Sequence, residues 1–173
     1  MIPKALSKFN KVATKHLIQL LQNIMRDSDS ELTIAQRELI AAYVSGLNSC
    51  DYCYLPHADV AESFGIEPGL VENLLQDFEN AEIENEMKPI LRFVKKLTLT
   101  PEKMVQSDAD SVRDAGWGER SLYDAIMICC MFNFINRFVY GMGLKIDSED
   151  YASFVTLQSM ILKRWGYELK TGL

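Results

Sequence analysis

The sequence predicts a single all-α domain of about eight helices. Apolar residues recur at helical spacing along nearly the whole chain, and no stretch shows the strict alternation of a β-strand. The 173 residues are enough to bury a sizeable core, and 48% hydrophobic with 24% charged residues is ordinary for a globular protein. Because no repeat, low-complexity segment or Pro/Gly/Ser linker divides the chain, residues 1–173 are expected to form one domain.

Two helices are predicted before the first cysteine. The first is expected to open at Pro3 and to end in the polar residues 26–30. Its apolar stripe is expected to contain Leu6, Phe9, Ala13, Leu17, Leu20 and Ile24. The second begins after Thr33, where Gln36 three residues later completes a capping-box pattern, and Gly46 is expected to stop it.

A third helix is expected to carry the first two cysteines and to end near residues 64–65. Five more helices are then expected at residues 68–78, 85–99, 108–115, 119–140 and 148–165. Ser107 and Ser148 are the expected caps of the third and fifth of these. The helix at residues 119–140 is apolar on most faces, which indicates a buried position.

Charge and hydropathy argue against two classes of partner. The net charge is −6 and the basic residues are scattered, unlike the basic stripe of a nucleic-acid-binding surface. The most apolar stretch, residues 125–135, is far shorter than the roughly 20 residues that cross a membrane. The N-terminal residues also lack the pattern of a signal peptide. We therefore expect a cytoplasmic protein, with reduced thiols and with neither nucleic acid nor membrane as partner.

The principal candidate site contains two cysteines and a histidine. Cys50 and Cys53 are three residues apart and His57 follows four residues later, so a helix would place all three on one face. A disulfide between Cys50 and Cys53 closes a very small loop and adds little stability, which suits a bond that is made and broken. Two alternatives remain at this point: a zinc site that includes Glu38, and two buried thiols with no chemistry.

The start of this helix bears on the state of the thiols. Asn48 or Ser49 is the expected N-cap, and the free N–H groups and dipole of a helix start favour a thiolate, at Cys50 above all. Pro56 lacks an N–H group and disturbs a helix that starts at Cys50. Either the helix kinks there, or regular helix begins only at about residues 54–56.

Glu38 is expected to join this site. It lies eight residues before Gly46, and His57 lies eight residues after Ser49. If the two helices form an antiparallel hairpin, each side chain lies about 12 Å from the turn, and the two are level. A carboxylate, an imidazole and two thiols would then converge, and such a group can accept and return a proton during thiol chemistry.

The spacing Glu38…Cys50-x-x-Cys53-x-x-x-His57 resembles the signature of the AhpD-like alkylhydroperoxidases, within the carboxymuconolactone decarboxylase-like group. A second motif, Phe-Asn-Phe-Ile-Asn-Arg at residues 132–137, is similar to a segment of the peroxidase-related branch of that group. The resemblance extends over about residues 6–146. It implies an all-α AhpD-like bundle, assembled into a homo-oligomer, either a trimer or a hexamer.

The resemblance also implies a reaction and a role for each residue. The reaction is reduction of a hydroperoxide, in an antioxidant role. Cys53 would be the peroxidatic cysteine and become a sulfenic acid, and Cys50 would resolve it as a disulfide. Glu38 and His57 would form the proton relay. No bound cofactor or metal is implied, and an external dithiol reductant of the lipoyl or thioredoxin type would reset the pair.

Other polar residues are expected to support the site. Tyr52 is expected to line the pocket, and Asn136 and Arg137, with Asn133, are expected to form a structural cluster of hydrogen bonds and ion pairs on a buried helix. Two other functions fit the same cysteines: a redox switch in an oligomeric binding protein, and a general disulfide oxidoreductase without preference for peroxides. The glutamate and histidine favour the peroxidase, since a switch does not need them.

Overall fold

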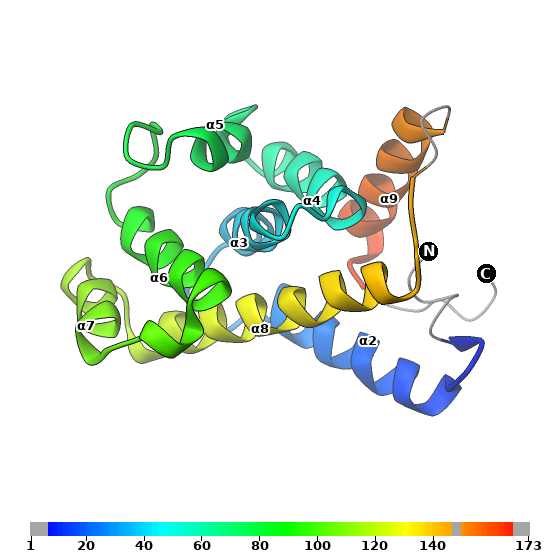
Figure 1. Cartoon of the computed structure of the whole chain (residues 1–173), viewed down its shortest axis with the longest axis horizontal. Helices are drawn as coiled ribbons and strands as arrows, with labels where there is room; N and C mark the ends of the chain where they lie inside the picture. Colours follow the sequence, from blue (N-terminus) through cyan, green and yellow to red (C-terminus); the bar gives the residue numbers. More distant parts are fainter. Residues whose placement is uncertain (1–6, 147–149, 168–173) are drawn as a thin grey trace.

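The computed structural model describes residues 7–146 and 150–167, and it confirms the all-α class. Within these residues the chain forms eight α-helices and one short 3₁₀ helix, with no β-strand. The helices are α2 (Lys11–Arg26), α3 (Ile34–Leu47), α4 (Asp51–Ser63), α5 (Leu70–Gln76), α6 (Met87–Leu99), η1 (Pro101–Lys103), α7 (Gln106–Asp114), α8 (Glu119–Gly141) and α9 (Tyr151–Trp165). They pack into one unit (Figure 1).

Helix α3 is the centre of the fold. It packs against α2, α4, α5, α6 and α8, and Figure 1 shows it nearly end-on inside this ring. Every residue of α3 from Ala35 to Ser45 is buried except Gln36. A helix that is buried on all sides must find partners for its charged residues. The burial of Glu38, which has no exposed surface, is therefore the first structural sign of a site.

Helix α8 forms the base on which α2, α3, α6 and α7 pack (Figure 1). Its 23 residues are long and apolar enough to cross a membrane by length and composition, but 56% of the relevant window is buried inside the protein. Core helices of globular proteins pass the same test. The expected burial of residues 119–140 is thus confirmed on the faces that contact α3 and α6.

The first predicted helix differs from the structure in its start and in its apolar stripe. Helix α2 begins at Lys11, because the side chain of Asn10 accepts a hydrogen bond from the N–H of Ala13 at 2.9 Å and caps it. The buried residues of α2 each follow a residue of the expected stripe by one position: Thr14, Ile18, Leu21 and Met25. Phe9 is 72% exposed as a result. Pro3 and Leu6 lie outside the described residues, as does the expected cap Ser148.

Two further boundaries need correction. The capping box of α3 is present, with Thr33 and Gln36 bonded to each other's backbone N–H groups at 2.9 and 3.2 Å. However, α3 continues through Gly46 to Leu47, so Gly46 does not stop it. Gly46 instead faces the side chain of Leu75 on α5 so closely that a Cβ atom would overlap it. Its lack of a side chain lets α5 pack against α3.

The predicted cap of α7, Ser107, is also wrong. The helix begins at Gln106 rather than after Ser107, because Asp108 Oδ2 accepts a hydrogen bond from the N–H of Val105 at 2.8 Å. Asp108 also binds Lys96 Nζ at 2.7 Å and ties α7 to α6. Val105 is therefore the N-cap, its N–H is held by Asp108 at the third helical position, and Ser107 lies inside the helix.

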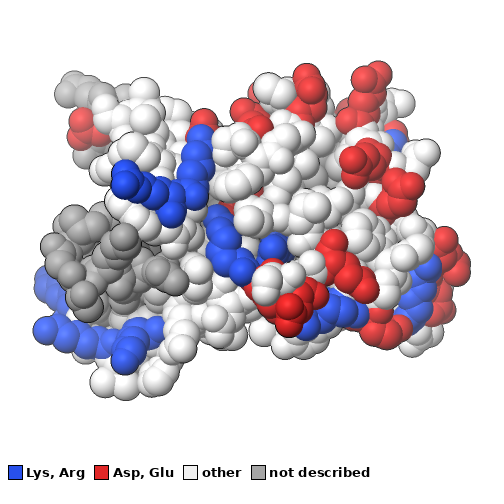
Figure 2. All heavy atoms as spheres, turned by 180° about the vertical axis from the view of Figure 1, so that it is seen from behind, with Lys and Arg blue, Asp and Glu red and all other residues white. Residues whose placement is uncertain are grey.

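Charges of both signs are mixed on the face that Figure 2 shows, and no continuous basic patch crosses it. Acidic side chains gather over the end of the molecule formed by α5, α6 and α7. This distribution is consistent with the net charge of −6.

Candidate active site

The turn between α3 and α4 positions the cysteines. It is held by backbone hydrogen bonds, including those from the N–H of Ser49 to the carbonyl of Gly46 at 2.8 Å and from the N–H of Cys50 to the carbonyl of Ser45 at 2.9 Å. Ser49 has a φ of 56°, which is unusual for a residue with a side chain. The turn brings the chain back along α3 and places Cys50 directly at the start of α4.

Helix α4 starts at Asp51, close to the earlier of the two expected starts, but its cap differs from the expected one. Cys50 itself is the N-cap, with no side-chain capping bond, so neither Asn48 nor Ser49 fills that position. Regular helix begins at Asp51 and contains Pro56, so a start at residues 54–56 is excluded. The early start is stabilised by hydrogen bonds from the N–H groups of Cys53 and Tyr54 to the Cys50 carbonyl, at 3.0 and 2.8 Å.

Both cysteines of the motif are buried free thiols. Cys50 is 1% exposed and Cys53 is 3% exposed. A hydrogen bond from the Cys53 thiol lowers the pKa of Cys50, and the backbone of Cys53 and the amide of Asn136 add to this effect against the opposing effect of burial. The same thiol–thiol bond, followed by burial and by the charge of Cys50, raises the pKa of Cys53 well above its ordinary value. Cys50 is therefore the more acidic of the two thiols, in agreement with its place at a helix start.

Glu38 and His57 meet across the helix hairpin, as the equal spacing from the turn predicted. Nδ1 of His57 lies 2.6 Å from Oε2 of Glu38, and both side chains are buried. Because a carboxylate only accepts hydrogen bonds, the shared proton fixes Nδ1–H as the donor. His57 lies one helical turn from Cys53 on the same face of α4. The described residues contain no direct hydrogen bond from His57 to either thiol.

A cation from another helix completes the environment of Glu38. Nη1 of Arg26, in the last turn of α2, lies 2.6 Å from Oε1 of Glu38. Burial alone would raise the pKa of Glu38, but the charges and hydrogen bonds of His57 and Arg26 together hold it below its ordinary value. Glu38 is therefore an anion with one hydrogen-bond donor on each oxygen, the guanidinium of Arg26 and the imidazole of His57.

Two rings enclose the imidazole. The ring of Phe132 on α8 meets His57 edge-on, with centroids 4.7 Å apart. The ring of Tyr167, after α9, lies nearly parallel to the imidazole at 6.1 Å. The hydroxyl of Tyr167 is 3.3 Å from Nδ1 of His57 and 3.4 Å from Oε1 of Glu38. Aromatic rings on both sides limit the access of water to the pair.

The asparagines of the second motif form a hydrogen-bond network under the cysteine turn. Nδ2 of Asn48 donates to Oδ1 of Asn136 at 2.9 Å and to Oδ1 of Asn133 at 3.1 Å. The amide of Asn136 donates to Ser45 Oγ at 3.1 Å. Its hydrogen bonds also lower the pKa of both Cys50 and Cys53. Nη1 of Arg137 binds Oδ1 of Asn133 at 2.7 Å. The expected hydrogen-bond cluster is thus present, but Arg137 has no carboxylate partner within residues 7–146 and 150–167.

Solved structures with the same helical arrangement identify the fold. An uncharacterized peroxidase-related protein from Silicibacter sp. TM1040 is 25% identical, with a TM-score of 0.77 over 88% of this chain and 79% of that chain. An uncharacterized peroxidase-related protein from Ralstonia eutropha JMP134, described as an alkylhydroperoxidase AhpD core, is 19% identical, with a TM-score of 0.75 over 89% and 78% of the two chains. The protein has the AhpD-like fold.

The same fold also carries other chemistry. The debrominase Bmp8, solved in complex with 2,3,4-tribromopyrrole, is 16% identical, with a TM-score of 0.70 over 87% of this chain and 79% of that chain. No protein-family model matches the sequence, and no curated protein matches it. The AhpD-like fold of the peroxidase-related proteins is therefore established by structure, as the sequence motifs predicted, and the reaction has to be argued from the site.

Tyr52 lies beside the two thiols of the motif, whereas Cys129 lies outside the site, against α6. Tyr52 packs on Phe154 of α9, with ring centroids 4.6 Å apart, and burial, followed by the charges of Cys53 and Cys50, raises its pKa. Cys129 is fully buried, and burial raises its pKa to about 11. Its sulfur contacts Thr98 Oγ1 at 3.3 Å, so it is a packed core thiol.

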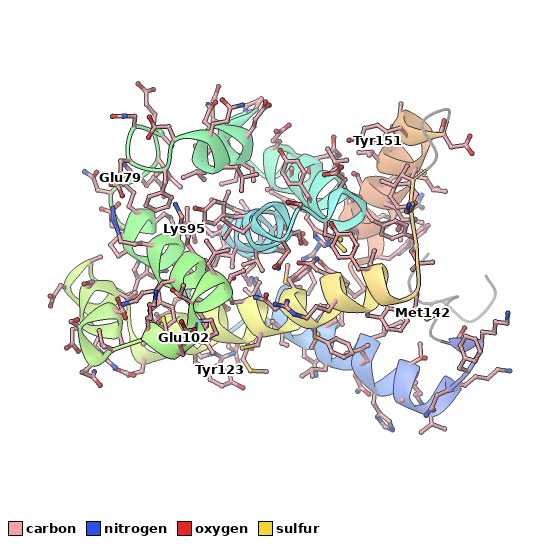
Figure 3. The ribbon with its side chains drawn as sticks, viewed as in Figure 1. Glu79, Lys95, Glu102, Tyr123, Met142 and Tyr151 are labelled. Atoms are coloured by element: carbon pink, nitrogen blue, oxygen red, sulfur yellow. The ribbon has the colours of Figure 1, made fainter. Side chains whose placement is uncertain are left out.

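Figure 3 shows side chains filling the space between α3, α4 and α8, with the labelled Met142 and Tyr151 at the end of the molecule where α8 and α9 lie. In the described parts of the chain, no group of three or more His, Cys, Asp or Glu side chains could hold a metal ion. Glu38 points to Arg26 and His57 instead, so the zinc alternative lacks a ligand set there.

Arg26, Asn48 and Tyr167 belong to the site although the sequence did not indicate them as site residues. Asn48 was seen only as a possible helix cap, and Arg26 only as part of a polar helix end. The one available signal for Arg26 was Glu38 itself, since a buried carboxylate on a central helix needs a cation. Tyr167 had no local signal, because only the packing of α9 brings it to His57.

Proposed function

We propose that the protein is a thiol-dependent hydroperoxide reductase with an antioxidant role. The observation that supports this most is the buried Glu38–His57 pair, one helical turn from a Cys-x-x-Cys dithiol. A redox switch needs only the two thiols, whereas turnover needs a group that manages protons beside them. The AhpD-like fold and the peroxidase-related names of similar structures are consistent with this reaction.

In the proposed reaction, Cys53 is the attacking sulfur because it lies nearer to His57 along α4. As peroxide binds, the Cys53 proton passes along the thiol–thiol bond to the Cys50 thiolate. The Cys53 thiolate attacks the terminal peroxide oxygen, the O–O bond breaks, and Cys53 becomes a sulfenic acid. The departing alkoxide takes a proton from His57, whose imidazolium form Glu38 stabilises, and leaves as an alcohol.

Resolution then forms the disulfide. Cys50 attacks the sulfur of Cys53, and its proton leaves with the sulfenic hydroxyl as water. An external dithiol, of the lipoyl or thioredoxin type, reduces the disulfide by exchange and returns the proton to His57. Overall, one hydroperoxide and one dithiol give one alcohol, one water and one disulfide. We place this cycle in a reducing compartment such as the cytoplasm, in a homo-oligomer, either a trimer or a hexamer.

A coupled assay tests the proposed function. Wild type is expected to consume alkyl hydroperoxide with dihydrolipoamide or dithiothreitol as reductant, and Cys53→Ser is expected to lose this activity. The matched control is Cys129→Ser, which removes a buried thiol outside the site. If wild type reduces a model disulfide but no peroxide, the protein is a general disulfide oxidoreductase. If it turns over neither, the redox-switch alternative stands.

The order of the two cysteines has its own test. Each single Cys→Ser variant is treated with peroxide and then with a reagent that labels sulfenic acids. A stable sulfenic acid on Cys53 in the Cys50→Ser variant is the expected result. Because Cys50 is the more acidic of the two thiols, a sulfenic acid on Cys50 in the Cys53→Ser variant would reverse the order.

A further inference from the structure

The C-terminal turns of α2 and α9 meet beside the Glu38–His57 pair. The carbonyl of Leu162, near the end of α9, accepts a hydrogen bond from Nη2 of Arg26 at 3.2 Å. The N–H of Tyr167 donates to Oε1 of Gln22 on α2 at 2.6 Å. Gly166 ends α9 with a φ of 62°, and a Cβ there would lie 3.1 Å from Cγ of Arg26. The C-terminal turn of α9 is therefore fastened onto α2 at close range.

This junction brings the side chains of Arg26 and Tyr167 to the carboxylate of Glu38. Nη1 of Arg26 lies 2.6 Å from Oε1 of Glu38, and Nδ1 of His57 lies 2.6 Å from Oε2. The Tyr167 hydroxyl lies against Oε1 of Glu38 and Nδ1 of His57, and its ring stacks over the imidazole. The guanidinium of Arg26 in turn lies 5.3 Å from the centre of the Tyr167 ring. Each member of this group contacts at least two of the others.

We propose that Arg26 and Tyr167 act together as a relay clamp, in which Arg26 keeps Glu38 ionised and Tyr167 keeps water away from the Glu38–His57 hydrogen bond. The inference rests on the proposed function, because it assigns positioning residues to that proton relay. Both are positioning residues rather than catalytic ones, since they contact the relay and not the thiols. A cation on the second oxygen of Glu38 also fixes the carboxylate, so its orientation toward His57 is set.

The charges around the pair determine the direction of the expected effects. The titratable and charged groups that face it are Arg26 from α2, Arg37 beside Glu38 on α3, Cys53 on α4, and Tyr167 after α9, while α8 presents Phe132. Arg37 is held by carbonyl groups, among them that of Asp27 at 2.9 Å. Arg26 is thus the cation bonded directly to Glu38, and its loss removes an interaction that lowers the pKa of Glu38.

Proton NMR can test the relay clamp without any turnover. The N–H of an imidazole bonded to a buried carboxylate gives a low-field signal when water exchange is slow. The chain has only two histidines, and His16 is exposed. The signal should therefore be absent from His57→Gln and present in His16→Gln, which assigns it to His57.

The decisive variants separate the two parts of the relay clamp. In Arg26→Gln the pH at which the signal disappears on acidification is expected to rise by about one unit. In Arg26→Lys this pH should return most of the way to the wild-type value, because the cation is kept. In Tyr167→Ala, exchange of the Nδ1 proton with water is expected to accelerate on the order of tenfold. Tyr167→Phe keeps the ring and should show a smaller acceleration. Arg92→Gln removes the same charge on α6, where Arg92 pairs with Glu79, and should change neither quantity.

In the peroxidase assay, the pH below which kcat falls is expected to be higher in Arg26→Gln than in wild type, with little change in KM. An unchanged signal midpoint in a folded Arg26→Gln protein, or unchanged proton exchange in Tyr167→Ala, overturns the inference. Because the NMR readout needs no peroxide, a wild type that lacks peroxidase activity refutes the proposed function separately. Circular dichroism of each variant establishes that it is folded.

Discussion

Asn48 donates a hydrogen bond to Asn136 at 2.9 Å, and this bond joins the turn before the cysteines to the C-terminal part of α8. The bond fixes the amide of Asn136 with its oxygen toward Asn48, so that its NH₂ group faces Ser45 and the thiols. The side chain of Asn136 is 1% exposed, so water cannot replace these contacts freely. Two segments almost ninety positions apart thereby share one polar network with the thiols of Cys50 and Cys53.

Replacement of Asn136 by Ala is expected to raise the pKa of the Cys50 thiol by about one unit, since a hydrogen bond to a charged group contributes about 1.5–3 kcal/mol. The rate of alkylation of Cys50 as a function of pH measures the shift. The matched control is Asn133→Ala, which removes an amide that also binds Asn48 but does not act on the thiols. An equal shift in both variants would mean that the network acts only by holding the turn.

Replacement of Glu38 by Gln is expected to destabilise the fold by about 3 kcal/mol, because it leaves Arg26 and His57 buried without their anion. Urea unfolding of the two proteins at neutral pH measures the difference in unfolding free energy. Peroxide reduction should also fall sharply, because the imidazole loses its partner. A variant as stable as wild type would show that the ion pairs contribute nothing net.

The contribution of Glu38 to stability should also depend on pH. Its pKa is lower in the folded protein, so its stabilisation is present above the unfolded pKa of about 4.3 and is lost as the pH falls through the folded value. The difference in unfolding free energy between wild type and Glu38→Gln should therefore shrink on acidification below about pH 4. Unfolding curves across an acidic pH series measure it, and a constant difference would contradict the assignment.

Replacement of Tyr52 by Phe is expected to leave peroxide reduction nearly unchanged. Burial and the nearby thiols raise the pKa of Tyr52, so its hydroxyl stays protonated and does not shuttle protons near neutral pH. The ring contact with Phe154 at 4.6 Å is kept in the Phe variant. Tyr52→Ala should instead impair activity, through loss of the ring that packs between α4 and α9. A large loss of kcat in Tyr52→Phe would assign the hydroxyl a role in proton transfer.

Replacement of Tyr43 by Phe is expected to leave the unfolding free energy unchanged or to raise it by about 1 kcal/mol. The Tyr43 hydroxyl is buried and has no hydrogen-bond partner among the described residues, so its removal relieves a desolvation cost. The ring stack on Phe78, with centroids 6.0 Å apart, is preserved. Thermal unfolding compares the two proteins. A clear loss of stability would reveal a bound water or another partner at this hydroxyl.

Local sequence signals predicted the helical class and the central pair of the site. Thr33 and Gln36 form a capping box with no help from the rest of the fold, and a hairpin with equal arms makes Glu38 and His57 level because helical rise is constant. The cysteine motif shares a helix with His57 for the same reason. These features depend on neighbours in the chain, which the sequence states directly.

Other features depended on competition between distant groups. Asn10 starts α2 later than the apolar pattern suggests, and Gly46 permits the approach of α5 instead of ending α3. The cation for Glu38 is also decided by packing: any of several arginines was available, and only the crossing of α2 with α3 selects Arg26. Tyr167 reaches His57 because α9 ends against α2. The spacing in the sequence was enough to bring together Glu38, His57 and the two cysteines, the groups of the proposed chemistry. Only the packed fold selects the charges and rings around them, because those contacts join residues that no local periodicity relates.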